Sequence, residues 1–319
     1  MSLFPRLYLL LLALTMLGAA QAQGFPNKPV KIVVSFTAGG TTDILAREMA
    51  QRLTVKFGQS FVVDNKPGAA GNIGTEIVAR SPADGYTLLA SSIGPMAVNP
   101  TLFRKLAVNP LTELVPVSPL ADVPNVLVVH PSLPVKTLNE FLAYAKTQDG
   151  KLSYPSTGVG TASHISGVML QKHVGVAMTH IPYKGAVALT DLIAGRTQFM
   201  VATAPSVLQH IRQGQLRALA VTSEKRAKAL PDVPTTMESG VHLMGSWFGI
   251  FAPKGTPPAI VIQLNLAMSE VLRSPDMIDK ISAHGAEAVS ASAAQYAAFV
   301  MKEYQNLKPI VLESGAVVD

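Results

Sequence analysis

The chain contains no cysteine among its 319 residues. Structural disulfides, thiolate zinc sites, a catalytic thiol and a lipid-modified cysteine are therefore excluded. Charged residues make up only 14% of the sequence, and the 26 Lys and Arg, against 20 Asp and Glu, form no basic run. This dispersed charge gives little support for nucleic-acid binding. Because 48% of the residues are hydrophobic, we expect a folded protein with a sizeable core.

Long apolar runs are also missing, except near the N-terminus. There, Arg6 precedes an apolar run over residues 7–17, and the small-residue pattern Ala20-Gln21-Ala22 follows. The run is about half the roughly 20 residues that a membrane-spanning helix needs. This pattern predicts a secretory signal peptide over residues 1–22, cleaved after Ala22, and a mature protein outside the cytoplasm.

Short apolar runs alternate with amphipathic segments along the remaining chain. We expect a strand over 31–36, then a helix that Thr42 or Asp43 caps and Gly58 ends. The same unit recurs, with further predicted strands over residues 61–64, 86–91, 126–130, 152–156, 179–181, 199–202 and 216–222. Thr137 and Glu140 form a predicted capping box at the start of one helix. This alternation predicts an α/β protein with parallel sheets and helices on both faces.

Two boundary signals suggest that the chain crosses twice between two domains. Pro124 precedes one apolar strand, and the polar stretch 223–228 follows another. The interval of about 100 residues has an ordinary domain size. We therefore predict one domain from residues 23–123 together with 224–319 and a second from residues 124–223. Two extended crossing strands would then act as a hinge for closure around a ligand.

Glycine-rich loops of similar composition follow four of the predicted strands. They cover residues 36–43, 68–72, 158–164 and 183–185, and they are small and mostly uncharged. Because helices that follow such loops direct their first N–H groups beyond the strand ends, the loops suit an anion. Backbone amides with the hydroxyls of Thr41, Thr42 and Thr161 could hold a carboxylate, since charge-assisted hydrogen bonds contribute roughly 1.5–3 kcal/mol each. The alternative, that the glycines only permit tight turns, stays open at this point.

The sequence shows no complete motif of a known catalytic or nucleotide-binding type. His164, His173 and His180 are spaced by nine and seven residues, which fits no common metal site, and we predict hydrogen-bonding and surface roles for them. A secreted serine hydrolase that uses Ser163 or Ser92 with His164 and Asp191 remains an alternative, because such triads assemble in space. Lys184 is expected to be a solvated charge at a loop rim. Trp247 and Phe248 are expected in the core.

Taken in order, the loop motifs resemble those of a known family. They are Phe36-Thr37-Ala38-Gly39-Gly40-Thr41-Thr42-Asp43, Asn65-Lys66-Pro67-Gly68-Ala69-Ala70-Gly71-Asn72-Ile73-Gly74, Asp84-Gly85-Tyr86-Thr87-Leu88, Asn99-Pro100, Gly158-Val159-Gly160-Thr161-Ala162-Ser163-His164, Pro182-Tyr183-Lys184-Gly185, Leu230-Pro231-Asp232-Val233-Pro234-Thr235 and Trp247-Phe248-Gly249. The ordered set covers nearly the whole mature chain. It is similar to the Bug family of periplasmic receptors, which are the substrate-binding proteins of tripartite tricarboxylate transporters. One departure is Ser35, where the family commonly has proline before the phenylalanine of the first loop.

The resemblance implies a clamshell of the type II periplasmic-binding-protein kind, in which two crossing strands join two doubly wound α/β domains. It implies a periplasmic monomer that captures a small organic acid between the domains and delivers it to the integral membrane permease of a tripartite tricarboxylate transporter. No catalysis, cofactor or metal is expected. A ligand-sensing partner of a membrane signalling protein is a second alternative that the sequence leaves open.

Carried over by position, the resemblance also implies a set of ligand contacts. They are Phe36, Thr37, Ala38, Gly39, Gly40, Thr41, Thr42, Ala70, Gly71, Asn72, Ser91, Ser92, Gly158, Gly160, Thr161, Ala162, Ser163, His164, Tyr183, Lys184, Thr203 and Ala204. Among these, Ser91, Ser92, Thr203 and the residues around Tyr183 are expected to select the ligand.

Overall fold

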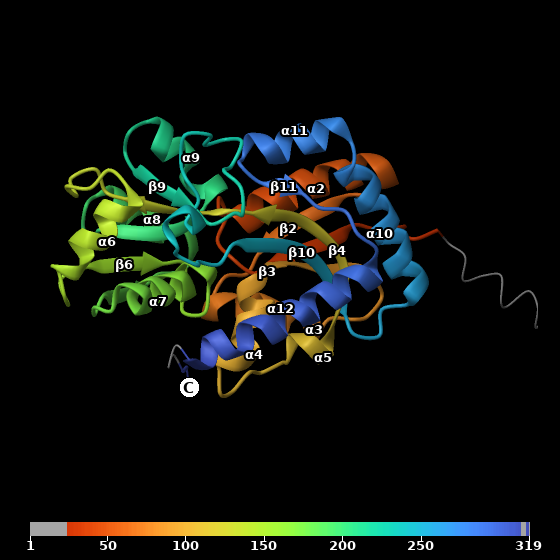
Figure 1. The fold of residues 1–319 in the computed structure, drawn as a ribbon. Helices are drawn as coiled ribbons and strands as arrows, with labels where there is room; N and C mark the ends of the chain where they lie inside the picture. The colour runs from red at the N-terminus through yellow and green to blue at the C-terminus, as the bar shows by residue number, and fades with distance from the viewer. Residues whose placement is uncertain (1–23, 314–316, 319) are drawn as a thin grey trace, which may run out of the picture.

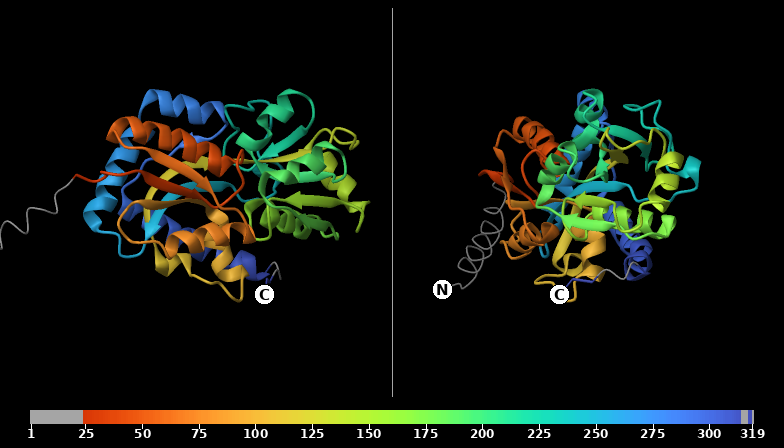
Figure 2. Two further views of the ribbon diagram at one scale, coloured as in Figure 1. Left: turned by 180° about the vertical axis from the view of Figure 1, so that it is seen from behind. Right: turned by 90° about the vertical axis from the view of Figure 1, so that its left-hand side faces the viewer.

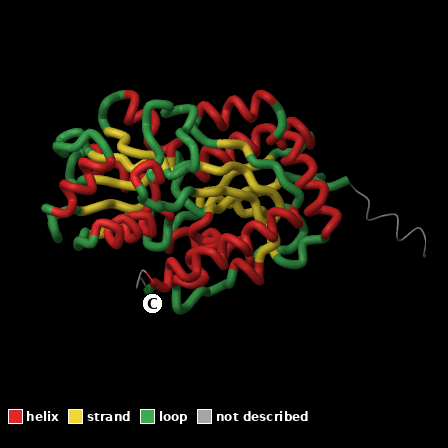
Figure 3. The backbone as a smooth tube through the Cα atoms, viewed as in Figure 1, coloured by secondary structure: helices red, strands yellow, loops and turns green. Residues whose placement is uncertain are grey.

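The computed structural model describes residues 24–313 and 317–318 of the chain, so the predicted signal peptide lies outside the described residues. Two α/β units lie side by side, joined near the middle of the molecule (Figure 1). In the tube view, strands lie at the centre of each unit and helices surround them (Figure 3). None of the helices within residues 24–313 is long and apolar enough to cross a bilayer.

The first unit is built on a six-stranded sheet with the order β11-β4-β10-β3-β1-β2. Its strands are β1 (Val30–Val34), β2 (Phe61–Asn65), β3 (Thr87–Ser92), β4 (Leu114–Val123), β10 (Ser246–Pro253) and β11 (Glu287–Ala288). Its helical segments are α2 (Thr41–Phe57), η1 (Ala69–Gly71), α3 (Asn72–Ala79), the π-helical η2 (Gly94–Val98), α4 (Asn99–Leu102), α5 (Pro110–Glu113), α10 (Pro258–Leu272), α11 (Pro275–Ala283) and α12 (Ala293–Glu313). Buried apolar clusters cover both faces of this sheet.

The second unit contains a three-stranded sheet, β8-β5-β9, and a two-stranded sheet, β6-β7. Its strands are β5 (Asn125–Val129), β6 (Ser153–Ser156), β7 (Thr179–Pro182), β8 (Phe199–Thr203) and β9 (Arg217–Val221). Its helical segments are α6 (Leu138–Lys146), α7 (Ala162–Val174), η3 (Gly185–Val187), α8 (Ala188–Ile193), α9 (Ala204–Arg212) and η4 (Met237–Ser239). Seen from behind and from the side, these helices lie around the strands of this smaller unit (Figure 2).

The prediction that the sheets are parallel throughout is wrong for the strands nearest the hinge. β1 pairs in parallel with β2 and β3, and β6 pairs in parallel with β7, as expected. However, β10 is antiparallel to β3 and β4, and β5 is antiparallel to β8 and β9. The reason is that β5 and β10 each begin at the hinge and run away from it, whereas β3 and β8 end there. A strand that brings the chain into a unit must oppose the strands that end at the same edge.

The two crossings between the units are short. β4 ends at Val123, and a single residue, Pro124, separates it from β5. The returning chain stays with the second unit beyond β9, because the Thr236 N–H donates to the Val221 carbonyl (2.8 Å) and Val241 and Leu243 are buried in that unit's core. The chain then enters the first unit at the start of β10.

Local signals set several helix ends. Helix α2 ends at Gly58, whose φ of 65° lies in the left-handed region, and the Gly58 N–H donates to the Thr54 carbonyl. The predicted capping box is confirmed, because the Thr137 hydroxyl accepts from the Glu140 N–H (3.2 Å) at the start of α6. The expectation that Thr42 or Asp43 caps α2 is wrong. The helix begins at Thr41, and Gly40 occupies the N-cap position without a side-chain bond.

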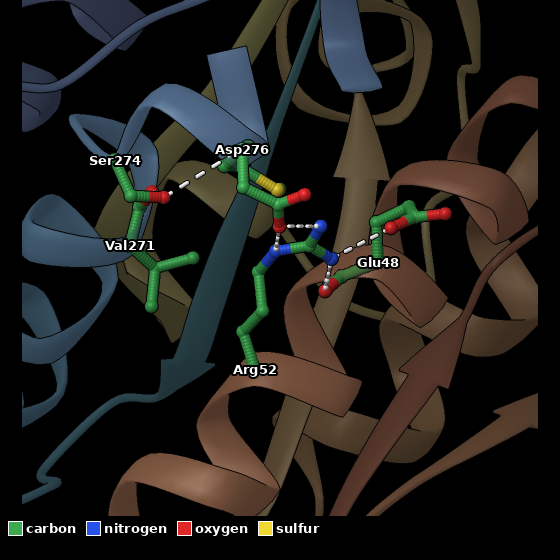
Figure 4. Close-up of polar contacts among 6 residues, drawn as sticks. Glu48, Arg52, Val271, Ser274 and Asp276 are labelled. Atoms are coloured by element: carbon green, nitrogen blue, oxygen red, sulfur yellow. Dashed lines mark hydrogen bonds and ion pairs between the residues drawn. The ribbon is translucent and has the colours of Figure 1, made fainter. Parts of the chain in front are cut away.

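An ion-pair network fixes α2 against α11 (Figure 4). Arg52 Nη2 lies 2.5 Å from Asp276 Oδ2, and Arg52 Nη1 lies 2.6 Å from Glu48 Oε2 one helical turn away. The Ser274 hydroxyl caps α11 by accepting from the Met277 N–H (3.4 Å). This contact joins the C-terminal half of α2 to α11 at the surface, while the buried Leu45, Met49 and Leu53 pack α2 on the first sheet.

Candidate ligand-binding cleft

A cavity of about 80 Å³ lies between the two units at the ends of the glycine-rich loops. Among the predicted ligand contacts, those that line it are Phe36, Thr37, Gly40, Thr41, Thr42, Thr161, Ala162, Ser163 and Thr203. They come from the loop before α2, the start of α7 and the end of β8. Three segments far apart in the sequence therefore meet at one place.

Two helices direct their N-termini at this cavity from opposite units. The Ile44 N–H donates to the Gly40 carbonyl (3.0 Å) at the start of α2, and the Ile165 N–H donates to the Thr161 carbonyl (3.1 Å) at the start of α7. The N–H groups that precede these bonds face the cavity end of each helix. Two partial positive charges thus converge on one space, which favours an anion there.

Hydrogen bonds already join the two walls of the cleft. The Thr41 and Thr203 hydroxyl oxygens are 2.7 Å apart, and the Ala186 N–H donates to the Thr37 hydroxyl (3.2 Å). Gly185, with a φ of +70°, lies so near Thr37 that an added Cβ would be 2.2 Å from the Thr37 hydroxyl oxygen. The cleft is therefore closed at its rim by direct contact between the units.

The second predicted loop lies beside the cavity and does not line it. The Asn99 side-chain amide donates to Asn72 Oδ1 (2.6 Å) and to the Ala70 carbonyl (3.3 Å). An added Cβ at Gly160, whose φ is +90°, would lie 2.4 Å from Asn99 Oδ1, so Asn99 also packs against the α7 loop. This side chain connects the loops of the two units at the floor of their interface.

The remaining predicted contacts also lie outside the cavity lining, and they are Ala38, Gly39, Ala70, Gly71, Asn72, Ser91, Ser92, Gly158, Gly160, His164, Tyr183, Lys184 and Ala204. Ser91 is fully buried behind the first loop, where its hydroxyl lies 3.1 Å from that of Ser35. The backbone N–H of Ser35 donates to the Ala90 carbonyl (3.3 Å), a bond that proline could not make. The departure at Ser35 therefore adds a bond between the first loop and β3.

Sequence reasoning missed part of the cavity wall. The additional lining residues are Asn125, Thr157, Ala186, Leu189, Met200, Val201, Ala202, Ser206, Ser246 and Phe248, while Gly185 of the predicted loop 183–185 also lines the cavity. Leu189, Met200 and Ala202 belong to one buried apolar cluster, so they form a continuous apolar wall. In the sequence they look like ordinary core residues, and the only available signal was that Met200 and Ala202 lie just before the predicted contact Thr203.

Buried histidines support the α7 loop. His164 and His180 stack with ring centroids 4.1 Å apart, and the Gly160 N–H donates to His164 Nδ1 (3.2 Å). His180 Nε2 lies 2.6 Å from the Ser156 hydroxyl, which also accepts from the Gly158 N–H (3.2 Å). Burial lowers the pKa of each ring to about 4, so both are neutral at pH 7. The predicted hydrogen-bonding role of these two histidines is confirmed, whereas His173 is exposed.

The residues of the hydrolase alternative have other partners. The Ser163 hydroxyl lies 3.0 Å from that of Thr161 and accepts from the Thr157 N–H (3.1 Å). Asp191 accepts from the Tyr183 hydroxyl and from Arg196 (2.7 Å). Within the described part of the chain, no group of three His, Asp or Glu residues could hold a metal ion.

A carboxylate close to the cavity is neutralised within the first loop. Asp43 is 4% exposed, and its carboxylate accepts from the Gly39 N–H (3.0 Å) and from Arg47 Nε (3.0 Å). Burial acts to raise the pKa of Asp43, but the bonds from Arg47, Gly39 and Asn65 hold it below its usual value. Asp43 is thus a paired anion that shapes the loop.

A larger cavity, of about 1090 Å³, lies across the hinge strands and touches none of the predicted contacts. Its walls include residues 223–229, Trp247 and the carboxylates of Asp122, Glu287 and Glu303. It is an open recess with charges of both signs, and no glycine-rich loop reaches it. The smaller cavity is therefore the candidate ligand site.

Comparisons with known proteins agree with this architecture. Residues 45–316 match the TctC family, described as the tripartite tricarboxylate transporter family receptor. Protein BugT of Bordetella pertussis is 40% identical over 92% of this chain and 92% of its own length. Among solved structures, Rpa4515 of R. palustris with adipate has a TM-score of 0.89, is 37% identical and covers 92% of this chain and 99% of its own. MatC of Rhodopseudomonas palustris with bound malate has a TM-score of 0.85, is 31% identical, and covers 90% of this chain and 100% of its own.

These likenesses confirm the predicted fold of two α/β units of the periplasmic-binding-protein type. They also confirm the resemblance on which the predicted contacts were based, while the contacts themselves remain predictions. The matching family is one of transporter receptors. The chain belongs to the tripartite tricarboxylate transporter receptor family, the periplasmic solute-binding proteins that include the Bug proteins.

Proposed function

We propose that this chain captures a small organic acid in the cavity between its two units and delivers it to the permease of a tripartite tricarboxylate transporter. The observation that supports this most directly is the convergence of the α2 and α7 N-termini on a cavity whose described lining has no charged side chain. Such a space can hold an anion by backbone N–H groups and hydroxyls alone. Adipate and malate in the two relatives are carboxylates of the same general class.

The energetic balance is favourable for a single carboxylate. Four or five charge-assisted hydrogen bonds would contribute roughly 6–15 kcal/mol before the losses of association. Micromolar affinity requires about 8 kcal/mol after those losses. We expect the ligand contacts to be those predicted residues that line the cavity, with the neighbouring loops holding them in place.

Opening of the cleft to admit a ligand would require the two units to move about the short crossings. We propose that the moving bodies meet at Pro124 and Gly245, with residues 125–244 as the second body. This places the return crossing later than the position near Glu224 expected from the sequence, because Val241 and Leu243 pack with the second unit.

The binding proposal is tested with the mature chain, residues 23–319. Native mass spectrometry of protein purified without added acids, followed by calorimetric titration with mono-, di- and tricarboxylates and amino acids, should find a ligand near or below micromolar affinity. Thr161→Val in the cavity wall should weaken that binding, whereas Thr54→Val on the far end of α2 should not. Folded protein that binds no member of this panel would contradict the proposal.

Export and delivery need separate experiments. We propose that residues 1–22 are a signal peptide, and the intact mass of the protein from a periplasmic fraction should match a chain that begins at Gln23. Affinity purification from membranes with and without the acid should recover permease subunits. Recovery of a sensor protein alone would favour a signalling role over transport.

A further inference from the structure

The larger cavity, called the recess below, lies on the opposite face of the crossings from the ligand cleft. Successive side chains of a strand point to opposite faces. On β10, Phe248 lines the cleft and Trp247 lines the recess, and at the other crossing Asn125 lines the cleft and Pro124 the recess. Figure 1 views the molecule from the side of α12 and β10, and the view from behind in Figure 2 shows α2 in front. A rotation about the crossings that opens the cleft therefore brings the walls of the recess together.

The two walls of the recess carry opposite charge. The first-unit wall holds three carboxylates and one guanidinium, and the second-unit wall holds three cations and one carboxylate. The charged residues are Asp122, Glu287, Glu303 and Arg273 on the first wall and Lys225, Arg226, Lys228 and Glu224 on the second. The second wall moves with the second unit, because Ala227 and Ala229 pack against that unit's apolar core. Opposite net charges therefore face each other across the recess.

In the closed form these charges do not meet. Within residues 24–313, no ion pair joins Glu287 or Glu303 to Lys225 or Lys228. The pKa of Asp122 is raised by burial and then by the charges of Glu287 and Glu303, so like charges lie close together on the first wall. The closed form thus leaves their attraction to the lysines unused.

The second wall lies within a short rotation of the first. The walls already touch at one end, where an added Cβ at Gly285 would lie 3.5 Å from the Cβ of Ala229. Ala229 directly follows Lys228, and Lys225 precedes it by four residues. Both lysine side chains are exposed and long, so they can reach across the recess as it narrows.

We infer that ion pairs across the recess stabilise the open, ligand-free receptor, in which Lys225 and Lys228 pair with Glu287 and Glu303. This inference rests on the proposed function, since it names the contacts that hold the same cleft open. An exposed ion pair changes an equilibrium by about 1.5-fold to 5-fold. Two or three such pairs therefore shift the open-to-closed ratio by about 3-fold to 30-fold. A ligand closes the cleft against these pairs, so they lower its apparent affinity.

The distance between two nitroxide spin labels, one on each unit, measures the open-to-closed ratio. Because the chain has no cysteine, Val55→Cys on α2 and Val187→Cys in η3 give unique labelling sites at exposed positions. Val187 follows Ala186, which contacts Thr37 at the rim, so opening lengthens the distance between the labels. In the mature chain refolded without acids, we expect an open population at about 20 mM salt that declines at about 500 mM salt, because salt screens exposed ion pairs.

Charge changes on the two walls test the pairing directly. Lys225→Gln with Lys228→Gln should lower the open-to-closed ratio by about 3-fold to 30-fold. Lys136→Gln with Lys151→Gln is the matched control, because it removes the same charge from exposed positions of the second unit outside the recess and should leave the ratio unchanged. Lys225→Glu with Lys228→Glu should lower the ratio further, and the addition of Glu287→Lys should restore part of it.

The outcomes separate this inference from the proposed function. If the acid-free chain is closed at low salt, if the recess and control variants change the ratio equally, or if Glu287→Lys restores nothing, the inference is overturned and the receptor function stands. The proposed function is decided by the calorimetric titration with acids, which the spin-label distances do not enter. Folded protein that binds no acid would therefore contradict that function, whatever ratio the labels report.

Discussion

The stacked pair of His164 and His180 predicts a measurable loss of stability in mild acid. Each ring has a pKa of about 4 in the folded chain because burial disfavours its charged form, and the nearby His164 lowers that of His180 further. An unfolded histidine has a pKa of about 6.5. The unfolded chain therefore binds protons first as the pH falls. The histidine contribution to stability is fully present above about pH 6.5, declines below it, and stops declining below about pH 4.

The size of this effect can be worked out for His164. One unit of pKa corresponds to about 1.4 kcal/mol. A ring whose pKa is about 6.5 in the unfolded state and about 4 in the folded state therefore lowers the free energy of unfolding by about 2 kcal/mol between pH 7.5 and pH 5. His164 is 5% exposed, so little screening reduces this value. His180 is more accessible, and we expect it to add only about 1 kcal/mol after screening. Most carboxylates are still ionised at pH 5, so the histidines dominate this interval.

Denaturant unfolding at about pH 7.5, 6 and 5 measures the effect. The wild-type free energy of unfolding should fall by about 3 kcal/mol across this interval. In His164→Asn the side-chain oxygen can still accept from the Gly160 N–H, and at least half of the pH-dependent loss should disappear. His173→Asn, at an exposed position on the same helix, should retain all of it. An equal pH dependence in wild type and His164→Asn would refute the argument from burial.

Three further substitutions test other contacts in the described structure. Gly71→Val should lower the free energy of unfolding by about 2–3 kcal/mol in denaturant titration, because Gly71 has a φ of +92° and an added Cβ would lie 2.5 Å from Pro95 Cγ. In the control Gly39→Ala, the added Cβ meets no atom within 4 Å, and the free energy of unfolding should fall by only about 1 kcal/mol. Asp43→Asn should lose about 1–3 kcal/mol at neutral pH, and the gap to wild type should narrow in acid because the wild-type carboxylate, whose pKa is lowered in the folded state, is protonated there. Asp122→Asn should raise the free energy of unfolding by about 0.5 kcal/mol at neutral pH, because the recessed position of Asp122 and then the charges of Glu287 and Glu303 raise the pKa of Asp122. A loss of stability in this variant would show that Glu287 and Glu303 do not repel Asp122.

Local patterns predicted strands β1, β2 and β3 and helix α2 of the first unit, but not strands β4, β10 and β11. The strand expected over 31–36 is β1 over Val30–Val34, and the helix expected to end at Gly58 does so. These features depend on neighbours in the sequence: an apolar run, a helical spacing of apolar residues and a glycine at a left-handed position. For these predicted elements, the observed ends differ from the expected ones by one or two residues.

Strand direction and half of the cavity wall could not be predicted, because both depend on contacts between distant residues. Nothing local to β10 shows that it runs antiparallel to β3, since its direction follows from where the chain crosses the hinge. Ala69 and Ala70 adopt positive φ values of 45° and 53°, which alanine rarely does. Asn99 binds the Ala70 carbonyl from a segment 29 residues away and so holds the loop in that conformation. No pattern within 68–74 contains this information.

One side chain joins the cavity to both crossings between the units. Asn125 is 1% exposed and lines the cavity. Its amide donates to the Met244 carbonyl (2.7 Å), its side-chain oxygen accepts from the Ser246 hydroxyl (3.0 Å), and its backbone N–H donates to the Thr222 hydroxyl (2.9 Å). A ligand that contacts Asn125 therefore acts directly on the residues about which the units would rotate. Because this amide is buried, a rotation that breaks its bond to Ser246 of the first unit leaves an unpaired polar group, at a loss of about 1–3 kcal/mol.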